Sequence, residues 1–456
     1  MRLSFLSGAF LAFLAGVCQA QYSGHVGPTI PATSKIYECN VLNYGAKADN
    51  VTDIGPAITS AFKNCVLKNT NSRLIVPAGN YLLSTTVSLN AGSNWAFQLD
   101  GLITLDYAAY VSGKVAGNAL VFQRMKEFEI YSSNGKGAIP SVTQVGILGQ
   151  GYIYRMRPNQ DGRSTWPRLL RVMTSTNFSV HDIMLVDSPS FHLVVSDATN
   201  AEVYRMTMRG GNQGALDGLD ISGTNYYVHH IEVTNRDECV CVKSPSKQAT
   251  IENIRCNQSG GMSMGSLQDG AAIENILIQN VENYQCTQAF MLKTYPGGAN
   301  PGYVKNVLLR NFTSIDVTYN AYITQYWQNS YVAGASGVQL SNITFSDWKG
   351  TVNNGAQRGA VVMIGSETNP PTNINVKNFS FWTTTGTKII DKCSSVYGSG
   401  SCIKPLAASA TATAYATASV TTTVKPSGFV APTAPWGIPA FDLYKPIPVP
   451  TGSTFY

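Results

Sequence analysis

A short pattern of apolar and polar positions recurs along the chain after residue 85. In each copy two apolar residues stand three positions apart, and the third position is polar, most often Asn or Asp. The first five copies follow one another at steps of 23, 25, 23 and 22 residues, and the later ones at steps of 31, 36 and 36 residues. The copies begin at Val180, Val203, Val228, Ile251, Ile273, Val304, Leu340 and Val376.

A repeat of this length with alternating apolar positions is typical of a parallel β-helix, in which each coil stacks its strands on the next coil. Residues at equivalent positions then form ladders about 4.8 Å apart. The leucine consensus of leucine-rich repeats is missing, and a β-sandwich would not keep so steady a period. We therefore predict an all-β protein built as a single-stranded right-handed parallel β-helix.

The two ends of the repeat region have their own patterns. From Gly55 to Cys65 the apolar residues fall on one helical face, which predicts a helix that covers the N-terminal end of the solenoid. After Cys402 the chain is rich in Ala, Thr, Ser and Pro and has too few large apolar residues for a core. We expect residues 21–402 to form the β-helix domain and residues 403–456 to form a loosely ordered tail, a candidate for O-glycosylation.

The first residues have the pattern of a secretory signal. Arg2 precedes an apolar run from Leu3 to Val17, and Cys18-Gln19-Ala20 provides the small-residue exit. The run is too short to span a bilayer, and no later segment is long and apolar enough. We expect residues 1–20 to be removed, a mature chain that begins at Gln21, and a secreted, extracellular protein without a membrane anchor.

The cysteines and sequons agree with an oxidising, secretory route. Eight cysteines follow the signal, and they include no CxxC pair, so disulfides are expected and no metal site is predicted. The expected pairs are Cys39–Cys65, Cys239–Cys256 and Cys393–Cys402, while Cys241 and Cys286 are left either paired or free. Six N-x-S/T sequons are candidate glycosylation sites: Asn50, Asn177, Asn257, Asn311, Asn342 and Asn378.

The charge is modest. Charged residues make up 13% of the chain, and the formal net charge of +6 falls to +5 when Arg2 leaves with the signal. No dense basic patch is present, so we expect no nucleic-acid partner. A small positive excess does suit a polyanionic substrate, because it raises the rate of encounter.

The densest group of polar residues lies in the central copies of the repeat. Asp217 and Asp237 are 20 residues apart, close to one coil, so both should lie on one face of the solenoid, together with Glu238. Hydrolysis of a glycoside needs an acid for the leaving oxygen and a base for water. Asp and Gly are also common in turns, but three carboxylates at coil spacing, followed by Gly260-Gly261 and Lys293, favour a catalytic site.

At these positions the chain resembles glycoside hydrolase family 28, the polygalacturonase-like enzymes, whose motifs NTD, DD, GHG and RIK lie in consecutive coils. Asp217 matches the aspartate of NTD, Asp237 and Glu238 match DD, and Lys293 matches the lysine of RIK. The short motifs Tyr44-Gly45-Ala46 and Val76-Pro77-Ala78-Gly79, near the N-terminus, extend the resemblance to nearly the whole mature chain. The chain departs from these motifs at Ala215-Leu216, Glu238, Gly260 and Met291. At these positions it is similar to the rhamnogalacturonan hydrolase branch of the family.

The resemblance implies an inverting, preferably endo-acting hydrolase that cleaves the α-1,2 linkage between galacturonic acid and rhamnose in pectin, without a cofactor and as a monomer. Within that frame we predict that Asp237 is the general acid, with Asp217 as the alternative acid. Asp217 and Glu238 would hold and activate the water. Lys293 would bind a substrate carboxylate, with Lys243 and Gly260 as further substrate-binding positions. The remaining polar residues of the region are expected to be structural (Asp220), ladder residues (His181 and His229) or a weak candidate (His230).

Four other functions fit parts of the pattern. The same family includes polygalacturonases and xylogalacturonan hydrolases, and a pectate-lyase-like eliminase also uses a parallel β-helix. Elimination needs calcium and a base at the uronate C5, so a cluster of acids with a lysine favours hydrolysis. A carbohydrate-binding β-helix without activity would share the repeat, and only the acidic cluster argues against it.

Overall fold

The computed structural model describes residues 22–134, 146–156, 165–297, 300–329, 337–353, 355, 357–386, 388–407, 409–421, 424–433, 441–442 and 444–450. The predicted signal peptide, residues 1–20, lies outside the described residues. In the part that is described, no helix is long and apolar enough to cross a membrane.

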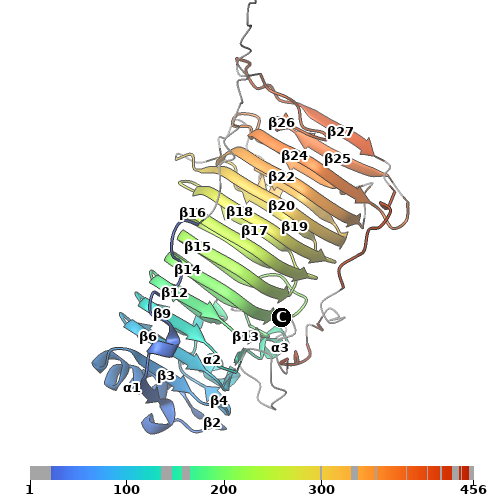
Figure 1. The fold of residues 1–456 in the computed structure, drawn as a ribbon. Coiled ribbons are helices and arrows are strands. Elements are labelled where there is room, and N and C mark those ends of the chain that lie inside the picture. The colour runs from blue at the N-terminus through green and yellow to red at the C-terminus, as the bar shows by residue number, and fades with distance from the viewer. Residues whose placement is uncertain are drawn as a thin grey trace, which may run out of the picture.

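The strands stack side by side along one axis, from β2 and α1 at one end to β27 at the other (Figure 1). In the first coils each turn of the chain contributes separate short strands to three columns. The first column contains β1 (Tyr37–Asn40), β3 (Ser72–Val76), β6 (Ser93–Leu99), β9 (Lys126–Tyr131) and β12 (Thr176–His181). The second contains β2 (Asp49–Asp53), β4 (Asn80–Leu83), β7 (Leu102–Leu105), β10 (Gly146–Leu148) and β13 (Met184–Val186). The third begins with β5 (Val87–Asn90), β8 (Asn118–Gln123) and β11 (Arg168–Met173).

In the later coils the strands become longer and run through the corners between columns. Three strands that cover all three columns are β14 (Leu193–Arg209), β15 (Leu219–Thr234) and β16 (Glu238–Asn257). The first two columns continue through β18 (Ala272–Tyr284), β20 (Tyr303–Val317), β22 (Gln339–Val352), β24 (Thr372–Trp382) and β26 (Gly398–Ser399). The third column continues through β17 (Gly261–Leu267), β19 (Gln288–Thr294), β21 (Tyr319–Thr324), β23 (Val361–Ile364) and β25 (Ile389–Ser394).

Buried side chains in register hold the coils together. One ladder of apolar residues runs through eleven paired positions of the first column, and each member is buried. Because neighbouring members belong to neighbouring coils, each one packs above and below on the next residue of the ladder. The ladder contains Leu74, Phe97, Ile130, Val180, Val203, Val228, Ile251, Ile278, Leu309, Phe345 and Val376. The alternating apolar pattern therefore marks the inside of a parallel β-helix, as predicted.

In the coils from β12 to β24, two corners contain a residue with positive φ, a conformation that Asn and Asp adopt more readily than most residues. At one corner the Asn side chains also donate hydrogen bonds to one another, as from Asn200 to Asn177 over 2.8 Å and from Asn225 to Asn200 over 2.8 Å. The second corner includes Asp182, His230 and Asn253. Both corners produce the same apolar, polar, apolar pattern in the sequence.

This duplication corrects the predicted repeat. Ile251 pairs with Ile278, not with Ile273, which pairs with Ser246. The copies that begin at Ile273, Val304 and Leu340 therefore belong to the other corner, so the prediction of a single series is wrong from Ile273 onward.

The predicted cap is confirmed. Helix α1 (Gly55–Asn64) buries Ala57, Ile58, Ala61 and Phe62, and the Cys39–Cys65 disulfide joins the end of this helix to β1. Phe62 lies against Trp95 of the first column, with ring centroids 5.1 Å apart. Two further short helices are α2 (Tyr107–Val111) and α3 (Gly151–Arg155). The remaining helical turns are 3₁₀: η1 (Ala32–Ser34), η2 (Val41–Tyr44), η3 (Val66–Lys68) and η5 (Trp327–Asn329).

The C-terminal tail is more ordered in its described parts than its composition predicts. Strand β27 (Ala416–Thr421) pairs antiparallel with β25 and closes the far end of the third column. Ile447 and Val449 then pack against Leu102 and Met184 in the N-terminal coils. Pairing of the backbone with an exposed sheet edge requires no large apolar side chains. The expectation of a loosely ordered tail is therefore wrong for these segments, and the division at residue 403 stays a prediction.

Candidate active site

A cleft of about 580 Å³ lies over the central coils of the third column. Its walls come from the turns that precede β15, β16, β17 and β19, from the strands themselves, and from the turn after β21. The lining residues are Phe191, Ala215, Asp217, Arg236, Asp237, Glu238, Lys243, Gly260, Ser263, Ser266, Thr287, Gln288, Met291, Lys293, Trp327 and Gln328.

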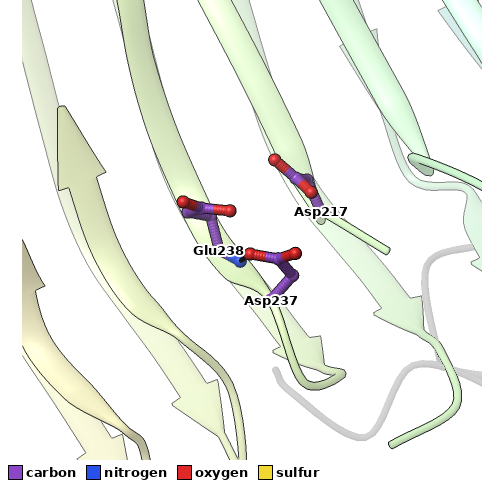
Figure 2. A group of neighbouring side chains, drawn as sticks. All are labelled: Asp217, Asp237 and Glu238. Carbon is purple, nitrogen blue, oxygen red and sulfur yellow. Dashed lines mark hydrogen bonds between the residues drawn. The ribbon is translucent and has the colours of Figure 1, made fainter. Parts of the chain in front are cut away.

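The three predicted carboxylates meet in this cleft. Asp217 lies in the turn before β15, Asp237 lies in the equivalent turn one coil later, and Glu238 is the first residue of β16 (Figure 2). One carboxylate oxygen of each residue lies within 4.8 Å of the other two. The spacing of about one coil between Asp217 and Asp237 thus brings them together, as the sequence predicted; their chemical roles remain a prediction.

Buried hydrogen bonds fix the two acidic turns against each other. The side-chain amide of Asn235 donates to the carbonyl oxygens of Leu216 over 2.7 Å and Glu238 over 3.1 Å. The backbone N–H of Gly218 also donates to the Glu238 carbonyl, over 2.9 Å. Because both turns share these contacts, the position of Asp217 is tied to that of the Asp237 and Glu238 pair.

A buried histidine holds the first acidic turn from below. The backbone N–H of His192 donates to the carbonyl oxygen of Asp217 over 2.9 Å, and its Nδ1 lies 3.0 Å from the same oxygen. Burial lowers the pKa of His192 to about 4, so the imidazole ring is neutral above that pH. Nothing in the sequence pattern marks this residue, because it lies in the turn before β14, outside the acidic motifs.

Asp237 and Glu238 have opposite electrostatic environments although they are neighbours. Burial and the adjacent Glu238 carboxylate raise the pKa of Asp237 to about 7. Burial also acts to raise the pKa of Glu238, but the hydrogen bond with Asp237 and the ammonium of Lys293 outweigh it and lower this pKa to about 2. Near pH 5 one carboxyl is therefore protonated and the other ionised, as paired acid and base groups require.

A second carboxyl pair lies beside the first. Asp217 and Asp220 are both buried and within hydrogen-bonding reach of each other, and Lys243 Nζ lies 3.4 Å from Asp220 Oδ2. Burial, together with the negative charges of Asp220 and Glu238, raises the pKa of Asp217 well above its usual range. Burial raises the pKa of Asp220 to about 6 although Lys243 opposes the shift. The free protein therefore holds Asp217 mainly protonated, which fits the alternative role of proton donor better than that of base.

The predicted substrate-binding residues all line the cleft, but each also has a partner in the protein. Lys293 is ion-paired with Glu238 and lies 4.5 Å from the centroid of the Trp327 ring. Lys243 donates to the carbonyl of Gly265 over 2.8 Å. An ammonium has three N–H donors, so both lysines keep capacity for a ligand.

Gly260 has a structural reason for its missing side chain. A Cβ at this position would lie 2.8 Å from the carbonyl carbon of Asp237, and the N–H of Gly260 donates to the Asp237 carbonyl over 2.6 Å. The close approach of this turn holds the loop that carries Asp237, so any larger residue would displace it.

Several lining residues were missed at the sequence level. Trp327 and Gln328 come from η5, which reaches the cleft from the coil after Lys293. Thr287 and Gln288 lie at the start of β19, and Phe191 precedes β14. A tryptophan between coils is no more distinctive in the sequence than a core aromatic, so the repeat alone could not assign it to the cleft.

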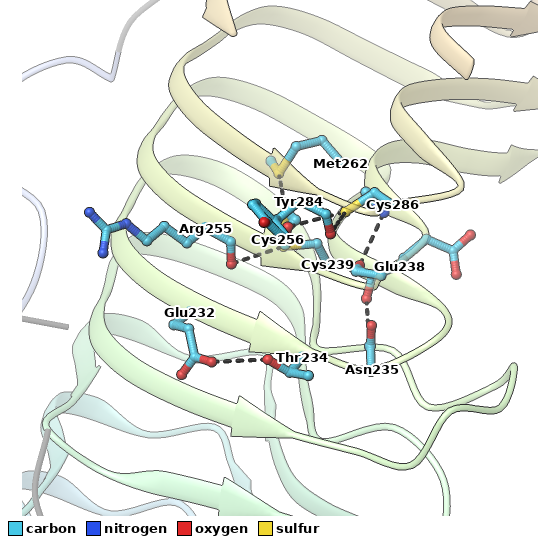
Figure 3. Close-up of a disulfide and its surroundings, with 12 residues drawn as sticks. Glu232, Thr234, Asn235, Glu238, Cys239, Arg255, Cys256, Met262, Tyr284 and Cys286 are labelled. Atoms are coloured by element: carbon cyan, nitrogen blue, oxygen red, sulfur yellow. Dashed lines mark hydrogen bonds between the residues drawn. A yellow bond between two sulfur atoms is a disulfide. The ribbon is translucent and has the colours of Figure 1, made fainter. Parts of the chain in front are cut away.

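The Cys239–Cys256 disulfide lies directly behind Glu238 (Figure 3). Its pairing is confirmed, as is that of Cys393–Cys402, and both residues of the first pair belong to β16. The bond joins the start and the end of this strand and so braces the coil that carries the acidic pair. Cys286 and Cys241 are free thiols, and both are buried.

Three carboxylates within 4.8 Å of one another could also hold a cation. Calcium takes six to eight oxygen ligands and is opposed by nearby positive charge. The ammonium groups of Lys293 and Lys243 already neutralise carboxylates of this cluster, and the described residues give no second observation that points to a metal.

The three histidines considered in the sequence, His181, His229 and His230, do not line the cleft. His181 stacks between Tyr131 and Tyr204 as a ladder residue, and His229 stacks on Tyr204, as predicted. His230 is at an outer corner and lines another cavity. Asn257 is 1% exposed, and its amide donates to Thr234, so the fold leaves no room for a glycan there. The other five sequons remain predictions.

The fold and the site define a class of protein. A solenoid that presents a protonated and an ionised carboxyl side by side in an open cleft is suited to acid–base cleavage of a polysaccharide that lies across several coils.

Comparison with known proteins makes the class specific. The sequence profile "Glycosyl hydrolases family 28" matches residues 66–402. "Rhamnogalacturonase A" of Aspergillus aculeatus is 41% identical over 459 residues, which cover 100% of this chain and 97% of that protein. "Probable rhamnogalacturonase B" of Neosartorya fischeri is 41% identical over 460 residues, which cover 100% of this chain and 84% of that protein.

The same fold is found in solved structures. The endo-xylogalacturonan hydrolase from Aspergillus tubingensis matches with a TM-score of 0.67 at 22% identity, over 77% of this chain and 94% of that one. This confirms the predicted right-handed parallel β-helix. The chain belongs to family 28 of the glycosyl hydrolases and is a glycoside hydrolase.

Proposed function

We propose that this enzyme hydrolyses the bond between galacturonic acid and rhamnose in the rhamnogalacturonan backbone of pectin. The full-length similarity to proteins named rhamnogalacturonases supports this substrate. The cleft supports it too, because Met291 lines it at the position that matches the arginine of the RIK motif of polygalacturonases. Met291 opposite a carboxylate would leave a charge without a partner, whereas it can pack against the methyl group of rhamnose.

The observation that carries the mechanism is the opposite protonation of Asp237 and Glu238. Asp237, with its pKa raised to about 7, is the proton donor to the leaving oxygen. It is also the least buried carboxyl of the three, so its proton can reach a ligand in the cleft. Glu238, kept ionised by Lys293, is the base that activates water. Asp217, which is protonated in the free protein, orients the water by hydrogen bonding and transfers no proton in this scheme.

Inversion follows if water, and not Glu238, attacks the anomeric carbon. Inverting enzymes usually hold their two carboxyls about 6.5–9.5 Å apart, and retaining enzymes about 5–5.5 Å. The nearest oxygens of the free protein are closer than either range, so the separation does not decide between the two courses. The ion pair with Lys293 makes Glu238 a poor nucleophile, because attack would separate it from its counterion.

Initial rates on two polymers test the substrate. Rhamnogalacturonan stripped of its side chains should be cleaved, and polygalacturonate should be cleaved at a rate lower by about a hundredfold or more, as expected when a carboxylate is left unpaired. Products without an unsaturated uronate, formed equally well in the presence of a chelator, would exclude elimination. Comparable rates on both polymers would overturn the proposed substrate and return the protein to the broader family.

We also propose that the protein is secreted and acts as a monomer outside the cell. The signal-like N-terminus and the three disulfides support an oxidising route. Detection of the mature chain, beginning at Gln21, in the culture medium would test the route, and light scattering would test the oligomeric state.

A further inference from the structure

Within the described residues, three cationic side chains line the cleft: Arg236, Lys243 and Lys293. The two lysines lie at one level of the sheet, because Val242 pairs with Met264 and Met264 pairs with Leu292. Each is paired with a carboxylate of the protein, Lys293 with Glu238 and Lys243 with Asp220. Most of their positive charge is therefore balanced by carboxylates of the acidic cluster.

Arg236 differs from both lysines. It lies in the turn between β15 and β16, directly before Asp237, and its side chain is exposed in the cleft wall. Its guanidinium makes no hydrogen bond or ion pair with any described residue, whereas the neighbouring Asn235 is buried and its side-chain N–H groups donate to both acidic turns. The chain thus places one uncommitted cation immediately beside the proton donor.

The position of Arg236 relative to the lysines matters for a polymer. Arg236 precedes Glu238, the first residue of β16, whereas Lys243 and Lys293 lie toward the ends of the strand segments that form the cleft floor. The acids therefore lie between a cation at the amino end of these segments and cations at the carboxyl end. In the alternating backbone a carboxylate occurs on every second sugar, so two galacturonates flank each rhamnose.

We propose that Arg236 binds the carboxylate of a backbone galacturonate at the amino-end side of the acids and thereby helps to select a uronate at that subsite. This inference rests on the proposed function. A guanidinium can donate two parallel hydrogen bonds to one carboxylate, which fixes the orientation of the sugar as well as its charge. Arg236 is a specificity residue, and Asp237 and Glu238 carry the chemistry.

The test compares Arg236→Gln and Arg236→Lys with the wild type on rhamnogalacturonan stripped of side chains. Arg236→Gln should raise KM by about ten- to a hundredfold, the value of a hydrogen-bonded charge pair, and leave kcat within about twofold, because a ground-state contact is lost. Arg236→Lys should raise KM by a smaller factor, because lysine keeps the positive charge but cannot donate two parallel hydrogen bonds from one planar group. The matched control is Arg124→Gln, which removes an exposed arginine from a corner far from the cleft lining and should behave as the wild type.

Salt and heat distinguish a substrate contact from a structural effect. The ratio of KM between Arg236→Gln and the wild type should shrink as salt is raised to about 0.5 M, because screening weakens an exposed ion pair, and the thermal midpoint should not change. A KM like that of the wild type, a ratio that does not depend on salt, or a lowered thermal midpoint would each overturn the inference. The wild type is assayed first: if it does not cleave this polymer, the proposed function fails before any variant is compared.

Discussion

Replacing Lys293 by Met tests whether the lysine creates the ionised base. The substitution removes the ammonium that is paired with Glu238 and replaces it with an apolar side chain of similar length. Burial would then raise the pKa of the Glu238 carboxyl, and the hydrogen bond with Asp237 would be the main contact that still lowers it. We expect its pKa to rise, because burial disfavours the charged form of a carboxyl group.

The size of the effect follows from the shift in the wild-type protein. Its environment lowers the pKa of Glu238 from 4.5 to about 2, which corresponds to on the order of 3 kcal/mol at about 1.4 kcal/mol per unit. Lys293 supplies part of this, since the hydrogen bond with Asp237 also lowers the pKa. Losing the lysine should therefore move the acidic limb of the pH–activity profile upward by about one to two pH units.

The same shift has a signature in stability, whose sign is fixed by linkage. Glu238 titrates below its unfolded value, so it contributes stability that is present above about pH 4.5 and is lost as the pH falls toward about 2. The free energy of unfolding of Lys293→Met should therefore differ most from that of the wild type above pH 4.5, and the difference should shrink at lower pH.

The assay is the pH dependence of kcat and of kcat/KM between about pH 3 and pH 8 for the wild type, Lys293→Met and Lys293→Arg. Lys377→Met is the control, because Lys377 is an exposed lysine in β24, away from the cleft lining. Lys293→Arg keeps the charge and should keep most of the acidic limb. An unchanged acidic limb in a folded Lys293→Met protein would refute the role of Lys293 in ionising Glu238, whatever its effect on substrate binding.

Four further outcomes are expected. Asp237→Asn and Glu238→Gln should each fold and lose activity by about a hundredfold or more, measured as kcat, and full activity in either would remove that residue from the mechanism. Wild-type activity should fall as the pH rises through about 7, where Asp237 loses its proton, and Asp237→Glu should shift that limb and not abolish it. Proton NMR of the first product should show the inverted anomer, whereas the retained anomer would mean that Glu238 attacks directly. Cys39→Ser should weaken hydrogen-exchange protection in α1 before that around Val228, because the Cys39–Cys65 bond closes a separation of 26 residues, and earlier loss around Val228 would contradict this.

The fold was predictable because each coil of a β-helix repeats the same buried positions and the same corner positions in the sequence. Alternating apolar residues mark the buried ladder, and Asn or Asp marks the turns with positive φ. The cap helix was predictable from the apolar face around Ala57 and Phe62. The phase of the repeat was not, because both corners use the same residue types, and a copy such as Ile273 looks identical to Ile251 without the register.

The acidic triad was predictable for the same reason that the fold was. Two residues about one coil apart become neighbours when the coils stack, so Asp217 and Asp237 needed no long-range information. Trp327, His192 and Arg236 were missed for different physical reasons. Trp327 reaches the cleft through the turn after its strand, His192 acts through a backbone carbonyl, and an exposed arginine in a turn looks the same in the sequence as one that faces solvent.

The stacking that brings the acids together also creates the electrostatic problem that the lysines solve. Four carboxyl groups in adjacent coils would repel one another if all were ionised, and burial would raise every pKa. The two lysines divide the cluster into two pairs, Asp237 with Glu238 and Asp217 with Asp220, in which the carboxylate nearer the lysine is the more acidic member. Because Lys243 and Lys293 lie at one level of the sheet, a one-residue insertion before either lysine would turn its side chain to the other face of the strand. The register of the third column therefore sets the protonation of the site as well as its geometry.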